Sequence, residues 1–176
     1  MRRFPGSRQW AMLAAASLLA VAAFACLGPE PLPDGCGLGL WRHVHHPDRL
    51  TVLRQCVTVS GMVVDASGGR RADGVRAEAD GDAHGWLRVD SSFSWTLVGG
   101  NQLYQSGNLL YEAVCVFPVT QQDARSACRG WSDSVKLPPI GSKVQITGTL
   151  VRDEGHLSWN EIHPVASIEI IGTGGG

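Results

Sequence analysis

Apolar and polar residues alternate with a period of two along most of the chain after residue 56, a pattern that predicts β-strands. The first strand is expected at residues 57–64, where apolar side chains fall on both faces and Gly61 stands in the middle. A glycine in mid-strand predicts a bend or bulge, which helps a sheet to curl into a barrel. Four further strands are expected, at residues 84–90, 109–117, 142–152 and 165–171.

One short helix is expected between the third and fourth strands. Thr120 can cap it and Asp123 lies in its first turn. Apolar or small residues then recur at helical spacing, at Ala124, Ala127, Cys128 and Trp131. The segment 91–107 is expected to be a long irregular connection. Three strands, a helix and two strands, with glycines in mid-strand, resemble the OB fold, a five-stranded Greek-key barrel. This mainly β architecture covers residues 53–171, and an antiparallel sandwich with a stray helix is the alternative.

Residues 1–25 predict an export signal. Basic residues open the chain, residues 10–24 form an apolar run too short to span a bilayer, and small residues precede Cys26. A cysteine in that place resembles the lipobox of bacterial lipoproteins, in which the cysteine is acylated. We therefore expect an exported protein of the bacterial cell envelope, anchored to a membrane through Cys26. Ordinary cleavage leaving a free Cys26 is the alternative, since Ala23 stands where a lipobox usually has leucine.

Five cysteines in an exported chain leave one without a partner, and Cys26 is the natural odd residue. The other four suit two disulfides in an oxidising compartment. Four cysteines allow three pairings, and we favour Cys36–Cys56 and Cys115–Cys128, each of which is local. No pair has the short spacing that thiolate metal sites favour.

Length and composition indicate one domain of ordinary size after cleavage. Residues 26–52 are expected to form a tether and N-terminal extension, and residues 172–176 a flexible tail. The chain has 15 basic and 16 acidic residues, and three of the arginines lie in residues 1–25. The exported part therefore keeps 12 basic against 16 acidic residues, a net charge of −4. Such a charge argues against nucleic acid as a partner.

Two polar clusters stand out against this background. The first contains Asp80, Asp82 and His84, and the second contains Glu161 and His163. Within each cluster a period of two places the side chains on one face of a strand. In an OB barrel the loops before strands two and five emerge at the same end and flank the ligand face. We therefore expect His84, Glu161 and His163 to lie within side-chain reach, with Asp80 or Asp82 at the rim.

Three kinds of chemistry fit this cluster. A structural polar network is one interpretation, because Asp-Gly-Asp is also ordinary turn chemistry. A site for a divalent metal ion held by His84, Glu161 and His163 is the second, since imidazoles and carboxylates suit zinc and similar ions. General acid–base catalysis is the third. The three close histidines His43, His45 and His46 admit a metal site too, although a solvated segment packed by its Trp and Val is the more ordinary interpretation.

The motif D-G-D-x-H at residues 80–84 and the motif W-N-E-I-H-P-V at residues 159–165 resemble those of small exported bacterial OB-fold proteins of unassigned function. The segment 43–50 before a cysteine is similar to that group as well. The resemblance implies a barrel but brings no established activity.

Two function classes follow. The first is a binding module for a small molecule or sugar, with Trp86, Trp159 and Tyr104 as stacking platforms. Its expected ligand-binding residues are Asp80, Asp82, His84, Trp86, Trp159, Glu161 and His163. The second is a metal-dependent hydrolase of thermonuclease type that would use the same Asp, His and Glu residues. That enzyme type needs arginines beside its carboxylates, and few lie near in sequence, so the binding module is favoured.

Overall fold

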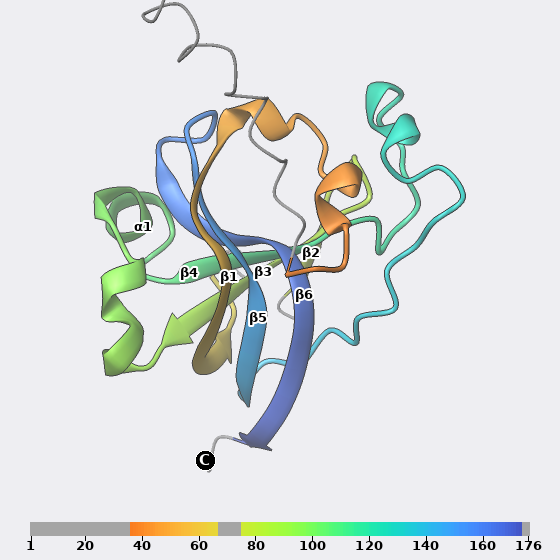
Figure 1. The fold of residues 1–176 in the computed structure, drawn as a ribbon. Coiled ribbons are helices and arrows are strands. Elements are labelled where there is room, and N and C mark those ends of the chain that lie inside the picture. The colour runs from red at the N-terminus through yellow and green to blue at the C-terminus, as the bar shows by residue number, and fades with distance from the viewer. Residues whose placement is uncertain (1–35, 67–74, 174–176) are drawn as a thin grey trace, which may run out of the picture. The chain divides into compact units, whose positions relative to one another are not determined.

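Six β-strands form one sheet that closes on itself (Figure 1). The computed structural model describes residues 36–66 and 75–173. The strands are β1 (Leu50–Val64), β2 (Val75–Ala77), β3 (Ala83–Val89), β4 (Leu109–Ala113), β5 (Ser142–Asp153) and β6 (Trp159–Thr173). In Figure 1, β5 and β6 are long curved strands that run along the barrel together.

The strand order is β1-β5-β6-β4-β3-β2, and an extra pairing of β1 with β3 closes a five-stranded barrel. All neighbours pair antiparallel except β4 and β6, which run parallel. β2 is a short addition at the edge of β3. This mixed closed barrel is consistent with an OB-like fold, and the closure argues against the open sandwich.

The predicted strands are present with different bounds. β1 begins at Leu50, so the first residues of the strand lie in what the sequence placed in the N-terminal extension. β6 begins at Trp159, and therefore contains the whole W-N-E-I-H-P-V motif. Shifts of register at Arg54 in β1 and at Gly148 in β5 explain why a strict period of two missed these residues.

Gly61 serves a different purpose from the predicted one. The register of β1 against β5 and β3 is continuous through it. A side chain at Gly61 would instead come within 2.5 Å of the Arg88 carbonyl oxygen on β3. The glycine thus allows β1 and β3 to approach where the barrel closes, while the shifts of register lie elsewhere, at Arg54 in β1 and at Lys143 and Gly148 in β5.

The helices differ most from the expectation. They are η1 (Leu40–His43), η2 (Pro47–Arg49), η3 (Ser91–Thr96), α1 (Gly99–Tyr104) and η4 (Asp123–Ser126), of which only α1 is an α-helix within the described ranges. The helix predicted at residues 120–131 is only the 3₁₀ turn η4. The disulfide at Cys128 and the stacking of Trp131 on His43 hold the rest of that segment as turns.

α1 lies in the connection that was expected to be irregular. It begins with two glycines, which have a low helix propensity, so the sequence did not predict a helix there. It is fixed instead by Asn101, whose amide group donates to the carbonyl oxygens of Asn108 and Asn160 and accepts from the Asn160 N–H. Tertiary contacts therefore override local preference here.

The core of the barrel consists of interior residues from all five of its strands. The largest of them are Leu87, Leu109, Tyr111, Ile146, Leu150 and Ile162. A second apolar cluster joins the extension to the outer face of the barrel. It contains Trp41, Val44, Leu50, Val114, Cys115 and Val151.

Both predicted disulfides are formed. Cys36 bonds to Cys56 and Cys115 bonds to Cys128, with Cα–Cα distances of 4.9 and 5.5 Å. The first links the N-terminal extension to β1, and the second closes the loop after β4. The pairing favoured from the sequence is confirmed.

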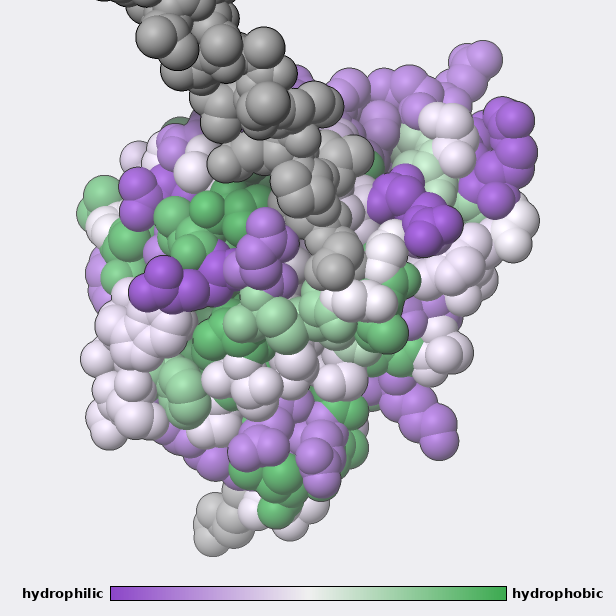
Figure 2. All heavy atoms as spheres, viewed as in Figure 1, coloured by the Kyte–Doolittle hydropathy of each residue, from purple (hydrophilic) through white to green (hydrophobic). Residues whose placement is uncertain are grey.

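Several predictions concern residues outside the described ranges: the signal at 1–25, the tether before residue 36, the lipidated Cys26 and the end of the tail. Within residues 36–66 and 75–173, no helix has the length and apolar character needed to cross a bilayer. Figure 2 shows hydrophilic and hydrophobic residues interspersed over one face. Near the end of β6, Ile170 and Ile171 are both about half exposed.

Candidate functional site

A row of polar side chains crosses three adjacent strands on the outer face of the barrel. His84 on β3 is the direct antiparallel partner of Glu112 on β4. The parallel register of β4 with β6 pairs Tyr111 with Ile162, which brings Glu112 beside His163. Tyr111 and Ile162 point into the barrel core, so alternation directs their neighbours to the opposite face. We call His84, Glu112, Glu161, His163 and the adjoining Asp82 the buried polar cluster.

Glu112 links the two histidines of this cluster. His84 Nδ1 lies 2.8 Å from one Glu112 carboxylate oxygen, and His163 Nδ1 lies 2.9 Å from the other. His163 Nδ1 also lies 3.0 Å from Glu161 Oε1, and Trp159 Nε1 donates to Glu161 Oε2 at 2.9 Å. The imidazoles therefore donate into carboxylates through Nδ1, which leaves their Nε2 atoms for other partners.

Asp82 approaches His163 from the other side. Its Oδ1 accepts from the Cys115 N–H at 2.8 Å, and its Oδ2 lies 3.6 Å from His163 Nε2. Among the described residues, no hydrogen-bond partner reaches Asp82 Oδ2, His163 Nε2 or His84 Nε2, although all three atoms are buried. Unpaired buried polar atoms are costly and uncommon in folded proteins. These three atoms therefore indicate that the cluster has a role beyond filling the space under the outer face.

Protonation in the cluster departs from ordinary values. Burial raises the pKa of Asp82 to about 8. Burial alone would lower the pKa of His163, but the charge and hydrogen bond of Glu112, aided by Glu161, raise it to about 10. Burial opposes ionisation of Glu112, yet the charge of His163 and the bonds to both histidines hold its pKa well below the usual range. At neutral pH Glu112 is thus ionised and His163 retains its proton.

The cluster is covered, not open to solvent. Val114 and Val151 lie on the same outer face of the barrel as the buried polar cluster. They belong to the second apolar cluster, which also contains Trp41 and Val44 of the N-terminal extension. His43 reinforces this cover, because its Nδ1 lies 2.7 Å from the Ala127 carbonyl oxygen. The side chains of Glu161 and His163 are each only 1% exposed.

A pocket of about 540 Å³ opens beside the cluster, with His84 and Glu112 in its wall. Its other lining residues come from the extension, from β2 and the turn before β3, from the loop after β4, and from the β5–β6 loop with the first residue of β6. They are His45, His46, Asp48, Arg49, Arg76, Glu78, Ala79, Asp80, Gln121, Gly155, His156 and Trp159. The indole of Trp159 stacks on His156 with ring centroids 5.6 Å apart. A smaller cavity of about 250 Å³ shares Arg76, His84 and Trp159 with this pocket.

Both arginines of the pocket are already paired. Arg49 Nη1 lies 3.0 Å from Asp153 Oδ2, and Arg76 binds the Glu78 carboxylate. The polar groups left to a ligand are therefore mainly carboxylates, imidazoles and the Gln121 amide, next to the indole of Trp159. Such a surface is suited to a neutral polar ligand.

The structure brings most of the predicted site residues together, in two layers. Asp80 and Trp159 line the pocket, His84 lies in its wall, and Glu161 and His163 lie in the buried cluster. Asp80 or Asp82 was expected at the rim, and Asp80 is the one that lines the pocket. Asp82 is only 2% exposed, because its carboxylate turns inward to the Cys115 N–H.

Two predicted stacking platforms do not line the main pocket. Trp86 is 3% exposed and its Nε1 donates to Gln105 Oε1, so it is a buried residue at the edge of the smaller cavity. Tyr104 borders that cavity too and is about half exposed.

Glu112 is the residue that sequence reasoning missed. It stands alone in the strongly apolar segment 109–117, where its charge was not read as a signal. A single acidic residue in an otherwise apolar strand is a detectable anomaly, because a buried carboxylate needs partners. Arg49 and Glu78 gave no such signal, since isolated charges are common at surfaces.

Comparison with known proteins does not supply a function. No protein-family model matches this chain, and no curated protein or solved structure is significantly similar to it. What the protein does must therefore be argued from the pocket and the cluster themselves.

Proposed function

We propose that this protein is an exported binding module of the bacterial cell envelope whose pocket takes a small neutral polar ligand, of which sugars are the favoured class. The observation that carries the proposal is the pocket of about 540 Å³ that combines the Trp159 wall with convergent polar side chains. Volumes of about 300–1,000 Å³ with a few directed polar groups are typical of small-molecule sites.

The chemistry of the pocket favours a sugar over an anion. An indole face packs against the apolar face of a sugar ring, while carboxylates, imidazoles and amides bind its hydroxyl groups. A phosphate-bearing ligand needs free cationic donors, and Arg49 and Arg76 are each occupied by a carboxylate. The net charge of −4 for the exported part also disfavours a nucleic acid.

A titration tests this proposal. The tag-free domain is titrated with a panel of neutral and N-acetylated mono- and disaccharides, with tryptophan fluorescence and calorimetry as the two signals. We expect at least one member to bind, and Trp159→Ala to weaken binding by about three- to tenfold, the worth of an aromatic contact. Trp159→Phe keeps an aromatic face and should retain most of the affinity.

Trp95→Ala is the matched control, because Trp95 in η3 is 52% exposed and does not line either pocket described above. A panel in which no sugar binds would refute the sugar proposal. Binding that survives Trp159→Ala unchanged would remove the ligand from this pocket.

We further propose that Cys26 carries a lipid anchor. Support comes from the apolar run before it and from the fact that the other four cysteines form two disulfides. Cys26→Ser should move the protein from the membrane fraction to the supernatant. Unchanged membrane association in that variant would contradict the anchor.

A further inference from the structure

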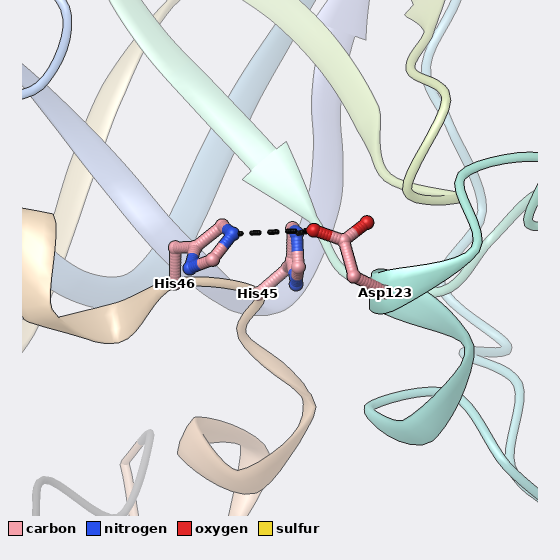
Figure 3. A group of neighbouring side chains, drawn as sticks. All are labelled: His45, His46 and Asp123. Atoms are coloured by element: carbon pink, nitrogen blue, oxygen red, sulfur yellow. Dashed lines mark ion pairs between the residues drawn. The ribbon is translucent and has the colours of Figure 1, made fainter.

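Two consecutive histidines and an aspartate distant in sequence lie together in Figure 3, and the two histidines line the edge of the pocket. His45 and His46 lie in the connection between η1 and η2, and Asp123 is the first residue of η4. Asp123 Oδ2 lies 3.6 Å from His45 Nε2 and 3.5 Å from His46 Nε2. Together they present two imidazole nitrogens and one carboxylate oxygen, all within 4.8 Å of one another.

These distances fit shared coordination better than direct hydrogen bonding. A hydrogen bond from nitrogen to oxygen spans about 2.7–3.2 Å, and both separations exceed that. Ligands of tetrahedral zinc, bound at about 2.0–2.2 Å, lie about 3.3–3.6 Å apart. Both distances from the carboxylate to the imidazoles thus already match the spacing that one shared ion requires.

The two segments are held in place by contacts that do not involve these three residues. His43 stacks on Trp131 with ring centroids 3.9 Å apart and lies 2.7 Å from the Ala127 carbonyl oxygen. The Cys115–Cys128 disulfide closes the loop that carries Asp123. The extension is therefore held against the loop at His43, and the disulfide constrains the loop on either side of Asp123.

The backbone at His46 adds to this arrangement. His46 has φ 50° and ψ 58°, the left-handed region that non-glycine residues seldom adopt. This conformation lets two consecutive histidines turn to the same side, with ring centroids 4.0 Å apart. Consecutive residues in a strand would point to opposite faces instead.

We propose that His45, His46 and Asp123 bind a divalent transition-metal ion, with zinc as the best fit. Imidazole and carboxylate ligands suit zinc, copper and nickel, whereas calcium prefers an all-oxygen set. Gln121 Nε2 lies 3.0 Å from His45 Nε2 and donates to it when the imidazole is neutral, the form that binds metal. The ion would replace this hydrogen bond.

Three protein ligands leave a fourth position of a tetrahedral zinc open. His45, His46 and Gln121 also line the pocket, so that position is on or near the pocket wall. The site is separate from the buried polar cluster and does not depend on the sugar proposal.

The test is calorimetric titration of the chelator-treated, tag-free domain with zinc chloride, followed by cobalt(II) as a spectroscopic probe. We expect one equivalent of zinc to bind, and the cobalt complex to show the intense visible bands of tetrahedral coordination. Both His46→Ala and Asp123→Asn should weaken zinc binding by more than about tenfold, since loss of a supporting residue alone costs 10–100-fold. Calcium chloride should not bind.

Two controls keep the proposal falsifiable. His156→Ala removes an exposed histidine of the same pocket and should leave zinc affinity unchanged. Asp82→Asn, in the buried polar cluster, should leave it unchanged as well. Absence of zinc binding, or binding that survives both His46→Ala and Asp123→Asn, would overturn the proposal. Loss of zinc binding in Asp82→Asn instead would assign the metal to the buried cluster and overturn it equally.

Discussion

Replacing Asp82 by asparagine should stabilise the protein at neutral pH. In the folded state Asp82 Oδ1 accepts from the Cys115 N–H at 2.8 Å, while Oδ2 faces His163 Nε2 at 3.6 Å. Asparagine keeps an oxygen for the first contact and places a neutral amide at the second. Like the protonated carboxyl group it carries no charge, and its amide N–H facing the His163 Nε2–H adds a cost that does not change with pH.

The sign and size of the effect follow from the pKa of Asp82, which burial raises from 3.8 to about 8. The folded state keeps a proton that the unfolded chain releases, so stability is lost as pH rises from the unfolded pKa to the folded one. Each unit of pH in this window costs about 1.4 kcal/mol, which gives about 4 kcal/mol between pH 4 and pH 7. The Asp82→Asn variant is free of this loss.

The assay is urea unfolding of both proteins at each pH from 4 to 8. The free energy of unfolding of Asp82→Asn minus that of wild type should increase with pH across this range and level off above pH 8. Other titrating groups, such as Glu112, are present in both proteins and largely cancel in this difference. Asp80→Asn is the control, because Asp80 is only partly buried and its Oδ1 accepts from the Asp82 N–H.

A difference that does not change with pH would show that Asp82 titrates normally. A difference that falls as pH rises would show that Asp82 is ionised against a charged His163. Either result would refute the protonation state derived for the cluster.

Two further predictions concern stability. Glu161→Gln removes a charged acceptor and turns an amide NH2 group toward either His163 Nδ1 or Trp159 Nε1, both of which are donors. Unfolding should therefore cost about 1.5–3 kcal/mol less by thermal or urea denaturation; an unchanged stability would contradict the buried charged hydrogen bond. Replacing Cys115 and Cys128 together by alanine should reduce stability by about 2–5 kcal/mol, and equal melting temperatures in calorimetry would show that this disulfide contributes nothing.

Much of the barrel can be predicted from local patterns in the sequence. Alternation predicted the strands of the barrel. The spacing of Glu161 and His163 placed both side chains on one face of β6, where His163 Nδ1 lies 3.0 Å from Glu161 Oε1. Cysteine number and spacing led to the observed pairing. These features depend on near neighbours along the chain, which a period of two or a short loop determines without knowledge of the rest.

The composition of the site was decided by tertiary structure. Glu112 joins His84 to His163 only because β4 lies between β3 and β6, a neighbour relation that depends on how the barrel closes. α1 forms because the Asn101 side chain hydrogen-bonds to the Asn160 backbone on β6, and this contact outweighs the low helix propensity of the two glycines.

The same holds for the proposed metal site, where His45 and Asp123 meet although their segments are far apart in sequence. Sequence determines which face a side chain takes on its own strand, because alternation is a property of the local backbone. Which side chains it then meets, and whether a carboxylate is exposed or held protonated, depends on strand order and on what covers that face.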